Sequence, residues 1–173
     1  AIYFDENGQE IGSDDYVKSG GKVINWQVKP LRRSFDSVLD NCAAVYAVEK
    51  DLEYAYRAKE YLKYQLEDMR WGMQYRTTTG YNNKMNDSYE AVHTVRSLQR
   101  DSVAYDMIAD SGVISTEEDA RIRELFQWVA NTETETSYYN YTSSNGQIHN
   151  YNADRISGLI LYSLCFPDNP GSA

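Results

Sequence analysis

The spacing of apolar residues constrains the fold of this chain more than any other feature. From Phe35 to Cys165 they recur every three or four positions, which is the period of an α-helix. Five segments share the pattern, and they begin near residues 35, 51, 87, 115 and 152. Each has an apolar stripe that a neighbouring helix must cover. The sequence therefore predicts an all-α fold of antiparallel helical hairpins.

The fourth and fifth segments carry the clearest local signals. Ser115 and Glu118 fit a capping box, in which each side chain bonds the other's backbone amide, so a helix should start directly after Ser115. The predicted core face of this helix consists of Ile122, Leu125, Phe126 and Val129. The predicted core face of the fifth helix consists of Ala153, Ile156, Leu159, Ile160, Ser163 and Leu164.

The connections between these segments alternate in length. Short turns join the first segment to the second and the third to the fourth, whereas residues 72–87 and 131–151 form two long connections. In an up-and-down array, alternate connections emerge at the same end, so both long ones should lie together. Loops of this length are uncommon unless they are functional or disordered. We therefore expect the functional residues at that end. Glu133 and Glu135 alternate with Thr in the second long connection, which predicts solvated side chains.

Residues 1–33 differ from the rest and are predicted to form a separate N-terminal unit, with the helical domain covering 34–173. Asn7-Gly8 lies between two short β-prone runs, which is typical of a β-hairpin turn. A Ser/Gly/Asp-rich stretch follows, and residues 23–30 are predicted to be extended and to end at Pro30.

Composition excludes several classes of function. The chain has 17 Lys+Arg against 26 Asp+Glu, a net charge of −9, which argues against binding to nucleic acid or to anionic membranes. It contains no apolar run long enough to span a membrane and no metal, phosphate-loop or nucleotide signature, so no cofactor is expected. Cys42 and Cys165 are expected to be free buried thiols, although a single bridge between them, in an oxidising compartment, stays open. The 16 Tyr residues suit half-exposed surfaces such as carbohydrate clefts or protein interfaces.

Three segments in this order resemble one enzyme group. They are AVYAVEKDLEYAYRAKEYLKYQL at 44–66, SVAYDMIADSGVISTEEDARIRELF at 102–126 and HNYNADRISGLILYSLCFPD at 149–168. Together they are similar to segments of the heparinase II/III and alginate lyase group of (α/α)-toroid polysaccharide lyases. The resemblance covers about residues 38–170. It implies part of an (α/α) toroid, a secreted or periplasmic location, and cleavage of a uronic-acid glycan by β-elimination, with further helical hairpins of the same or another chain as partners.

The resemblance also assigns residues to a site. Asn150 matches the family's Asn, which neutralises the sugar carboxylate and so makes the neighbouring proton more acidic. The family's next residue is usually His, whereas here it is Tyr151, and His149 comes one position early. Either Tyr151 or His149 could remove the proton next to the sugar carboxylate. A further catalytic Tyr and His of this family would lie beyond Ala173.

The long connections supply the other candidates. Arg76 and Lys84 are the basic groups best placed to meet a sugar carboxylate, although solvated charges are an equally simple interpretation. Aromatic side chains that could stack against sugar rings, or pack as part of a loop, are Tyr81, Tyr138, Tyr139 and Tyr141.

Two other functions stay open. One is a glycosidase with paired carboxylates, since (α/α) toroids also host hydrolases. The other is a non-catalytic helical module that binds glycan or protein through its Tyr/Asn-rich loops, or that forms a structural piece of a larger assembly.

Overall fold

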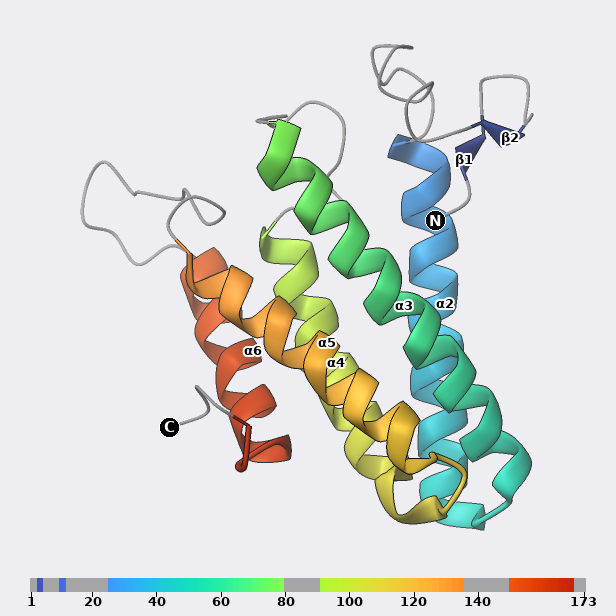
Figure 1. Cartoon of the computed structure of the whole chain (residues 1–173). Helices are drawn as coiled ribbons and strands as arrows, with labels where there is room; N and C mark the ends of the chain where they lie inside the picture. Colours follow the sequence, from blue (N-terminus) through green and yellow to red (C-terminus); the bar gives the residue numbers. More distant parts are fainter. Residues whose placement is uncertain (1–2, 5–9, 12–24, 80–90, 136–149, 170–173) are drawn as a thin grey trace.

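The chain is an array of antiparallel α-helices, as Figure 1 shows. The computed structural model describes residues 3–4, 10–11, 25–79, 91–135 and 150–169. Within these ranges the elements are β1 (Tyr3–Phe4), β2 (Glu10–Ile11), α2 (Asn25–Glu49), α3 (Leu52–Thr79), α4 (Ala91–Ile108), the 3-10 turn η2 (Ala109–Ser111), α5 (Thr116–Thr134) and α6 (Asn150–Cys165). The predicted all-α class is confirmed.

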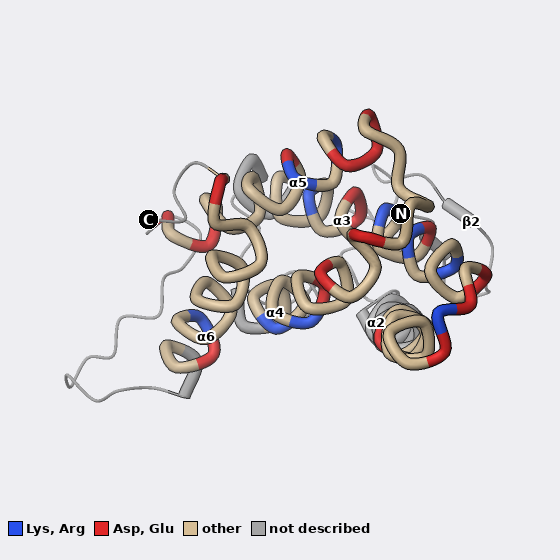
Figure 2. Tube along the Cα trace, turned by 90° about the horizontal axis from the view of Figure 1, so that it is seen from below, with Lys and Arg blue, Asp and Glu red and all other residues tan. Residues whose placement is uncertain are grey.

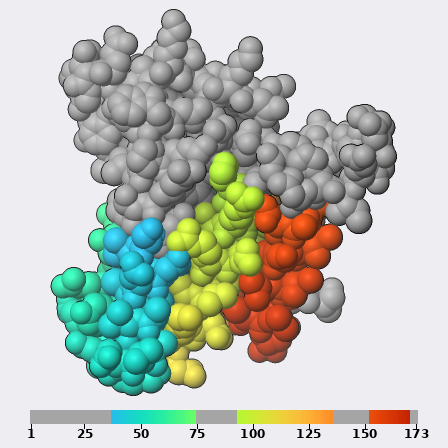
Figure 3. Space-filling view, turned by 180° about the vertical axis from the view of Figure 1, so that it is seen from behind, coloured from blue at the N-terminus to red at the C-terminus, as the bar shows by residue number. Residues whose placement is uncertain are grey.

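The helices lie in two layers. One layer holds α2, α4 and α6, with α4 packed between the other two, and the second holds α3 and α5 (Figures 2 and 3). Because the chain runs up and down, the three helices of the first layer point the same way and the two of the second point the opposite way. Helices α3 and α5 end, and α4 and α6 begin, at one end of the array, which we call the loop end. The sequence predicted that both long connections lie at one end of the array. The structure confirms this for the ends of the helices that these connections join.

The core lies between the two layers. Its largest fully buried side chains are Phe126, Phe166, Leu39, Leu62, Leu66, Met69, Met73, Leu98, Ile108 and Ile122. The predicted core face of α5 is buried, and its capping box is present: the Glu118 amide donates to Ser115 Oγ at 3.2 Å, and the Ser115 amide donates to Glu118 Oε2 at 3.0 Å. One polar link crosses the core, where Gln65 Nε2 donates to both carboxylate oxygens of Asp101 at 2.7 and 2.9 Å.

The N-terminal prediction is partly wrong. Helix α2 begins at Asn25, so most of the segment predicted to be extended is helical. Pro30 lies inside this helix, in its second turn, and does not end the segment as the sequence predicted. Strands β1 and β2 pair antiparallel, with Tyr3 opposite Ile11. The Asn7-Gly8 turn lies outside the described residues, so the hairpin and the division near residue 33 stay predictions.

The predicted buried face of α6 is wrong for most of its residues, although Leu159 does pack against the core. Ile156, Ile160 and Leu164 are exposed by 58, 53 and 70%, whereas Gly158, Tyr162 and Phe166 face the core. This helix is apolar on two sides, so its periodicity predicts a helix without showing which side packs. The side that packs contains a glycine, which lets α6 approach α4 closely.

Both cysteine thiols are free; Cys42 is buried and Cys165 half-buried. Burial raises the pKa of each thiol. None of the described helices is long and apolar enough to cross a lipid bilayer.

The turn between α2 and α3 contains a strained residue. Lys50 has φ = 59°, in the left-handed region that usually holds glycine, and its amide donates to the Tyr46 carbonyl at 2.9 Å. We expect Lys50→Gly to raise the free energy of unfolding by about 0.5–1 kcal/mol, because glycine adopts this φ without steric cost. Urea denaturation would measure the change. Lys50→Ala keeps the Cβ and is the matched control; an equal gain in that variant would contradict the explanation.

Candidate functional site

The structure places the backbones of three predicted site residues at the loop end. Asn150 and Tyr151 are the first two residues of α6, and Arg76 lies in α3 rather than in the loop where it was predicted. Helix α3 continues to Thr79 because the buried stripe of Leu66 and Met69 extends through Met73, past Gly72. The structure does not describe the side chains of these three residues.

The other predicted site residues lie outside the described part of the chain. They are Tyr81, Lys84, Tyr138, Tyr139, Tyr141 and His149. Their roles stay predictions.

A buried polar cluster lies just inside the loop end. Glu133 belongs to α5 and is completely buried, which corrects the prediction of a solvated loop residue. The hydroxyl of Thr94, on α4, donates to its carboxylate, and Arg155 Nε, on α6, donates to its backbone carbonyl at 2.8 Å. These contacts tie α4, α5 and α6 together near the loop end. Glu133 lies four residues after Val129, so the apolar stripe of α5 already placed it on the core face.

Ion pairs fix the same helices from outside. Arg96 on α4 pairs with Asp154 on α6 at 2.6 Å, and Arg100 on α4 pairs with Asp40 on α2. Both arginines therefore pair with acids of neighbouring helices. Asp154 and Glu133 are thereby engaged in holding helices together, which weakens the glycosidase alternative that needs them as catalytic carboxylates.

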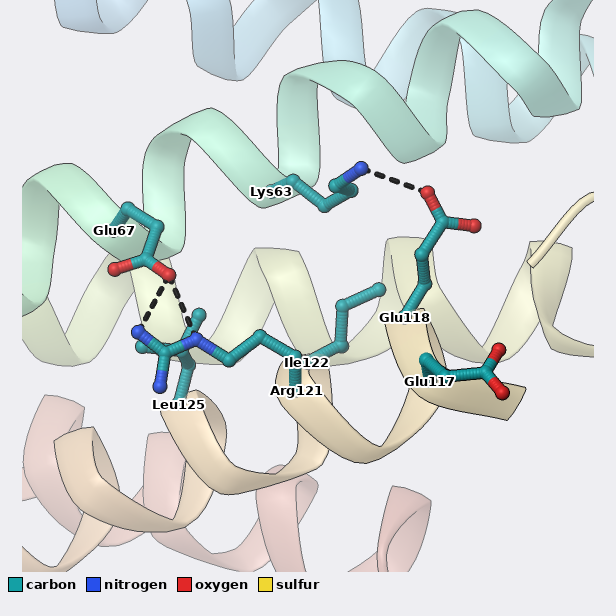
Figure 4. A pocket seen from close by; sticks show the side chains of 7 residues that line it. All are labelled: Lys63, Glu67, Glu117, Glu118, Arg121, Ile122 and Leu125. Atoms are coloured by element: carbon teal, nitrogen blue, oxygen red, sulfur yellow. Dashed lines mark hydrogen bonds and ion pairs between the residues drawn. The ribbon is translucent and has the colours of Figure 1, made fainter. Parts of the chain in front are cut away.

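A groove lies between α3 and α5. Its volume is about 230 Å³, and Figure 4 shows the side chains that line it. Ile122 and Leu125 are buried beneath it, and charged side chains form its rim: Lys63, Glu67, Glu117, Glu118 and Arg121. Sites for small molecules are usually larger than this and offer free polar groups.

The charges of the groove mostly bind one another. Lys63 Nζ lies 2.7 Å from Glu118 Oε1, and Arg121 lies 2.7 Å from Glu67 Oε1. The nearly buried Lys59 donates to Glu118 Oε2 and to the Val113 carbonyl, each at 3.1 Å. The hydrogen bond from Lys63, helped by the Ser115 amide and by Lys59, lowers the pKa of Glu118 to about 2. The groove is therefore a structural contact between α3 and α5.

Tyr105 is a buried structural residue. Its ring stacks on Phe166 with centroids 4.8 Å apart, and its hydroxyl donates to Asp119 in the first turn of α5. Burial and this hydrogen bond raise the pKa of Tyr105 to about 12. The neighbouring Asp106 is exposed, so it is Asp119 that links Tyr105 to the start of α5.

No family model, curated protein or solved structure matches this chain. The candidate site is thus defined by the chain itself. The site is the loop end of the array, where α6 begins at Asn150 and where the last turns of α3 carry Arg76. The Glu133 cluster lies just inside this end.

Within the described residues, no group of three or more His, Cys, Asp or Glu side chains could hold a metal ion. The chemistry proposed below uses amide, cationic and phenolic or imidazole groups.

Proposed function

We propose that this chain is part of a polysaccharide lyase that cleaves a uronic-acid glycan by β-elimination, with its substrate at the loop end of the array. The observation that carries the proposal is the convergence of α3 and α6. Arg76 and Asn150 are far apart in the sequence, yet their helices end and begin at the same end of the molecule. A secreted or periplasmic location follows from this function.

The two-layered array supports the proposal in a second way. An (α/α) toroid is built from helical hairpins that alternate between two layers and have their long connections at one end, as the hairpins of this chain do. An open array has the same local packing, so the closed toroid is part of the proposal.

The chemistry needs a group that neutralises the sugar carboxylate and a group that moves a proton. The Asn150 amide takes the first role, and Arg76 or Lys84 adds positive charge beside the same carboxylate. Tyr151 or His149 removes the proton on the carbon next to the carboxylate. The electron pair of that C–H bond forms a C=C double bond, the neighbouring C–O bond breaks, and the glycosidic oxygen leaves and takes up a proton. Tyr81, Tyr138, Tyr139 and Tyr141 would hold the adjacent sugar rings by stacking.

The direct test is to incubate the protein with alginate, heparan and chondroitin and to follow the ultraviolet absorbance of the unsaturated product. We expect one polymer to give product and Asn150→Ala to lower the rate by at least about 100-fold, the usual effect of removing one group that stabilises developing charge. Asn131→Ala is the matched control, because Asn131 is an exposed residue of α5 near the same end.

Tyr151→Phe and His149→Ala, tested in parallel, identify the proton-moving residue. Absence of product from all three polymers, together with unchanged glycan binding by Asn150→Ala, would exclude a lyase that acts through Asn150.

A non-catalytic helical module is the second candidate. The exposed aliphatic face of α6 favours it, because such a surface is typical of a piece that packs within a larger assembly. Glycan binding without product formation, measured by calorimetry on the same three polymers, would support this alternative.

A further inference from the structure

We propose that this chain associates head to tail with a second copy of itself, through an exposed face of α6 on one copy and an exposed face of α2 on the other. We call these faces the α6 edge and the α2 edge. The α6 edge consists of Ala153, Ile156, Ile160 and Leu164, and the α2 edge consists of Ser37, Asn41, Ala44 and Val48. The proposal concerns assembly and does not depend on the lyase function.

The α6 edge is an exposed aliphatic surface that none of the other described helices covers. Its Ile156, Ile160 and Leu164 side chains are more than half exposed, at 58, 53 and 70%. No charged residue occurs from 156 to 167, and Figure 2 shows this uncharged stretch of α6. Contiguous exposed aliphatic residues on one helix face indicate a surface that another protein covers.

The α2 edge is complementary to it. All four of its residues are exposed, with Val48 at 78%, and no charge occurs from 41 to 48. Ser37, Asn41 and Ala44 have short side chains, which leave room for Ile and Leu from a facing helix. Large side chains opposite small ones pack more closely than two aliphatic ridges do.

The positions of the two edges extend a contact that already exists. Helices α2, α4 and α6 form one layer and point the same way, with α6 and α2 at its opposite margins (Figure 3). An α6 edge placed against the α2 edge of a second copy therefore continues the same layer. Because each copy contributes a different edge, the contact is heterologous and can close into a ring or continue as a chain.

Charge limits where two copies can meet. The net charge of −9 makes copies repel one another, and this repulsion is weakest for a contact from which acidic side chains are absent. The outer face of α3 exposes Glu53, Arg57 and Glu67, whereas both edges are uncharged. Two copies can therefore meet at the edges without bringing like charges together.

Sedimentation velocity over a range of concentrations tests the proposal with two variants, Ile160→Glu and Ala44→Glu. Each removes one edge at an exposed position, so the fold should be kept, which circular dichroism would check. Tyr64→Glu is the matched control, because Tyr64 is 77% exposed on α3, away from both edges.

We expect the unmodified chain and Tyr64→Glu to form larger species as concentration rises, and each edge variant alone to stay monomeric. An equimolar mixture of the two edge variants should form a dimer and nothing larger, because only one intact edge of each kind is left. Three results would overturn the proposal: a monomeric unmodified chain at every concentration, association of Ala44→Glu equal to that of the unmodified chain, or a mixture that stays monomeric. The second result would indicate a symmetric contact between two α6 edges.

Discussion

Glu118→Gln should lower the free energy of unfolding by about 2 kcal/mol at neutral pH. The substitution removes the charge that Lys59 and Lys63 bind, and the side chain of Lys59 is only 6% exposed. Loss of one partner of a fully buried ion pair costs about 3–5 kcal/mol. Because the Glu118 side chain is 25% exposed, we expect a smaller loss, of about 2 kcal/mol. Urea denaturation would measure it. Glu117→Gln is the matched control, since Glu117 is exposed in the same helical turn, and it should change stability by less than about 0.5 kcal/mol.

The same carboxylate should make stability depend on pH. Its pKa is lowered from 4.5 to about 2 in the folded chain, so the unfolded chain binds the proton more tightly. The stabilisation that Glu118 contributes is therefore complete above about pH 5 and is lost as the pH falls toward 2. Denaturation curves collected across this range should show a smaller loss in Glu118→Gln than in the unmodified chain. Equal losses in the two proteins would contradict the assignment of this ion-pair cluster as the contact that holds α3 to α5.

Gly158→Ala should lower the free energy of unfolding by about 2 kcal/mol. An added Cβ would lie 2.6 Å from Val95 Cγ2 and 2.8 Å from the Val95 carbonyl oxygen, and the second atom can move only if α4 moves. Overpacking of this kind costs about 1–3 kcal/mol, and sometimes more, which exceeds the gain of up to about 1 kcal/mol that alanine brings to a helix interior.

Thermal and urea denaturation would test this prediction. Ser157→Ala is the control, because it introduces alanine at the exposed neighbouring position without adding a Cβ. A double variant with Val95→Ala should recover part of the loss, since it removes the side-chain clash and leaves the carbonyl clash. Stability of Gly158→Ala equal to that of the unmodified chain would show that α4 and α6 can separate freely at this point.

Local signals in the sequence predict the helices well. The capping box at Ser115 fixes the start of α5, and the stripe of Ile122, Phe126 and Val129 faces the core as expected. Such features depend on residues within one or two turns of each other, so they can be recognised without knowledge of the fold.

Features that depend on two helices at once are harder to predict. Both sides of α6 are apolar, and only the close contact of Gly158 with Val95 decides which side is buried. Glu133 was predicted to be solvated because it lies in a polar stretch, yet the hydroxyl of Thr94, on another helix, holds it in the core. The sequence places Glu133 in register with the core stripe, but its partner could not be identified before α4 and α5 were seen together.

The candidate site, too, is predictable only in part: the positions of its helices follow from the sequence, and the contacts of its side chains do not. The structure confirms that the helices carrying Arg76 and Asn150 share the loop end, because that result follows from the alternation of short and long connections. The geometry of the side chains that would contact a glycan involves residues outside the described ranges, such as Lys84 and Tyr139, and their roles depend on experiment.

Hydrogen–deuterium exchange with and without an oligouronate tests the central claim most directly, since it locates bound glycan whether or not the chain is catalytic. We predict added protection at the last turn of α3, at the first turn of α6 and in the segments that adjoin them, with no change along the α3–α5 groove. Protection confined to that groove or to the α2 edge, with none around Asn150, would contradict the assignment of the loop end as the functional site.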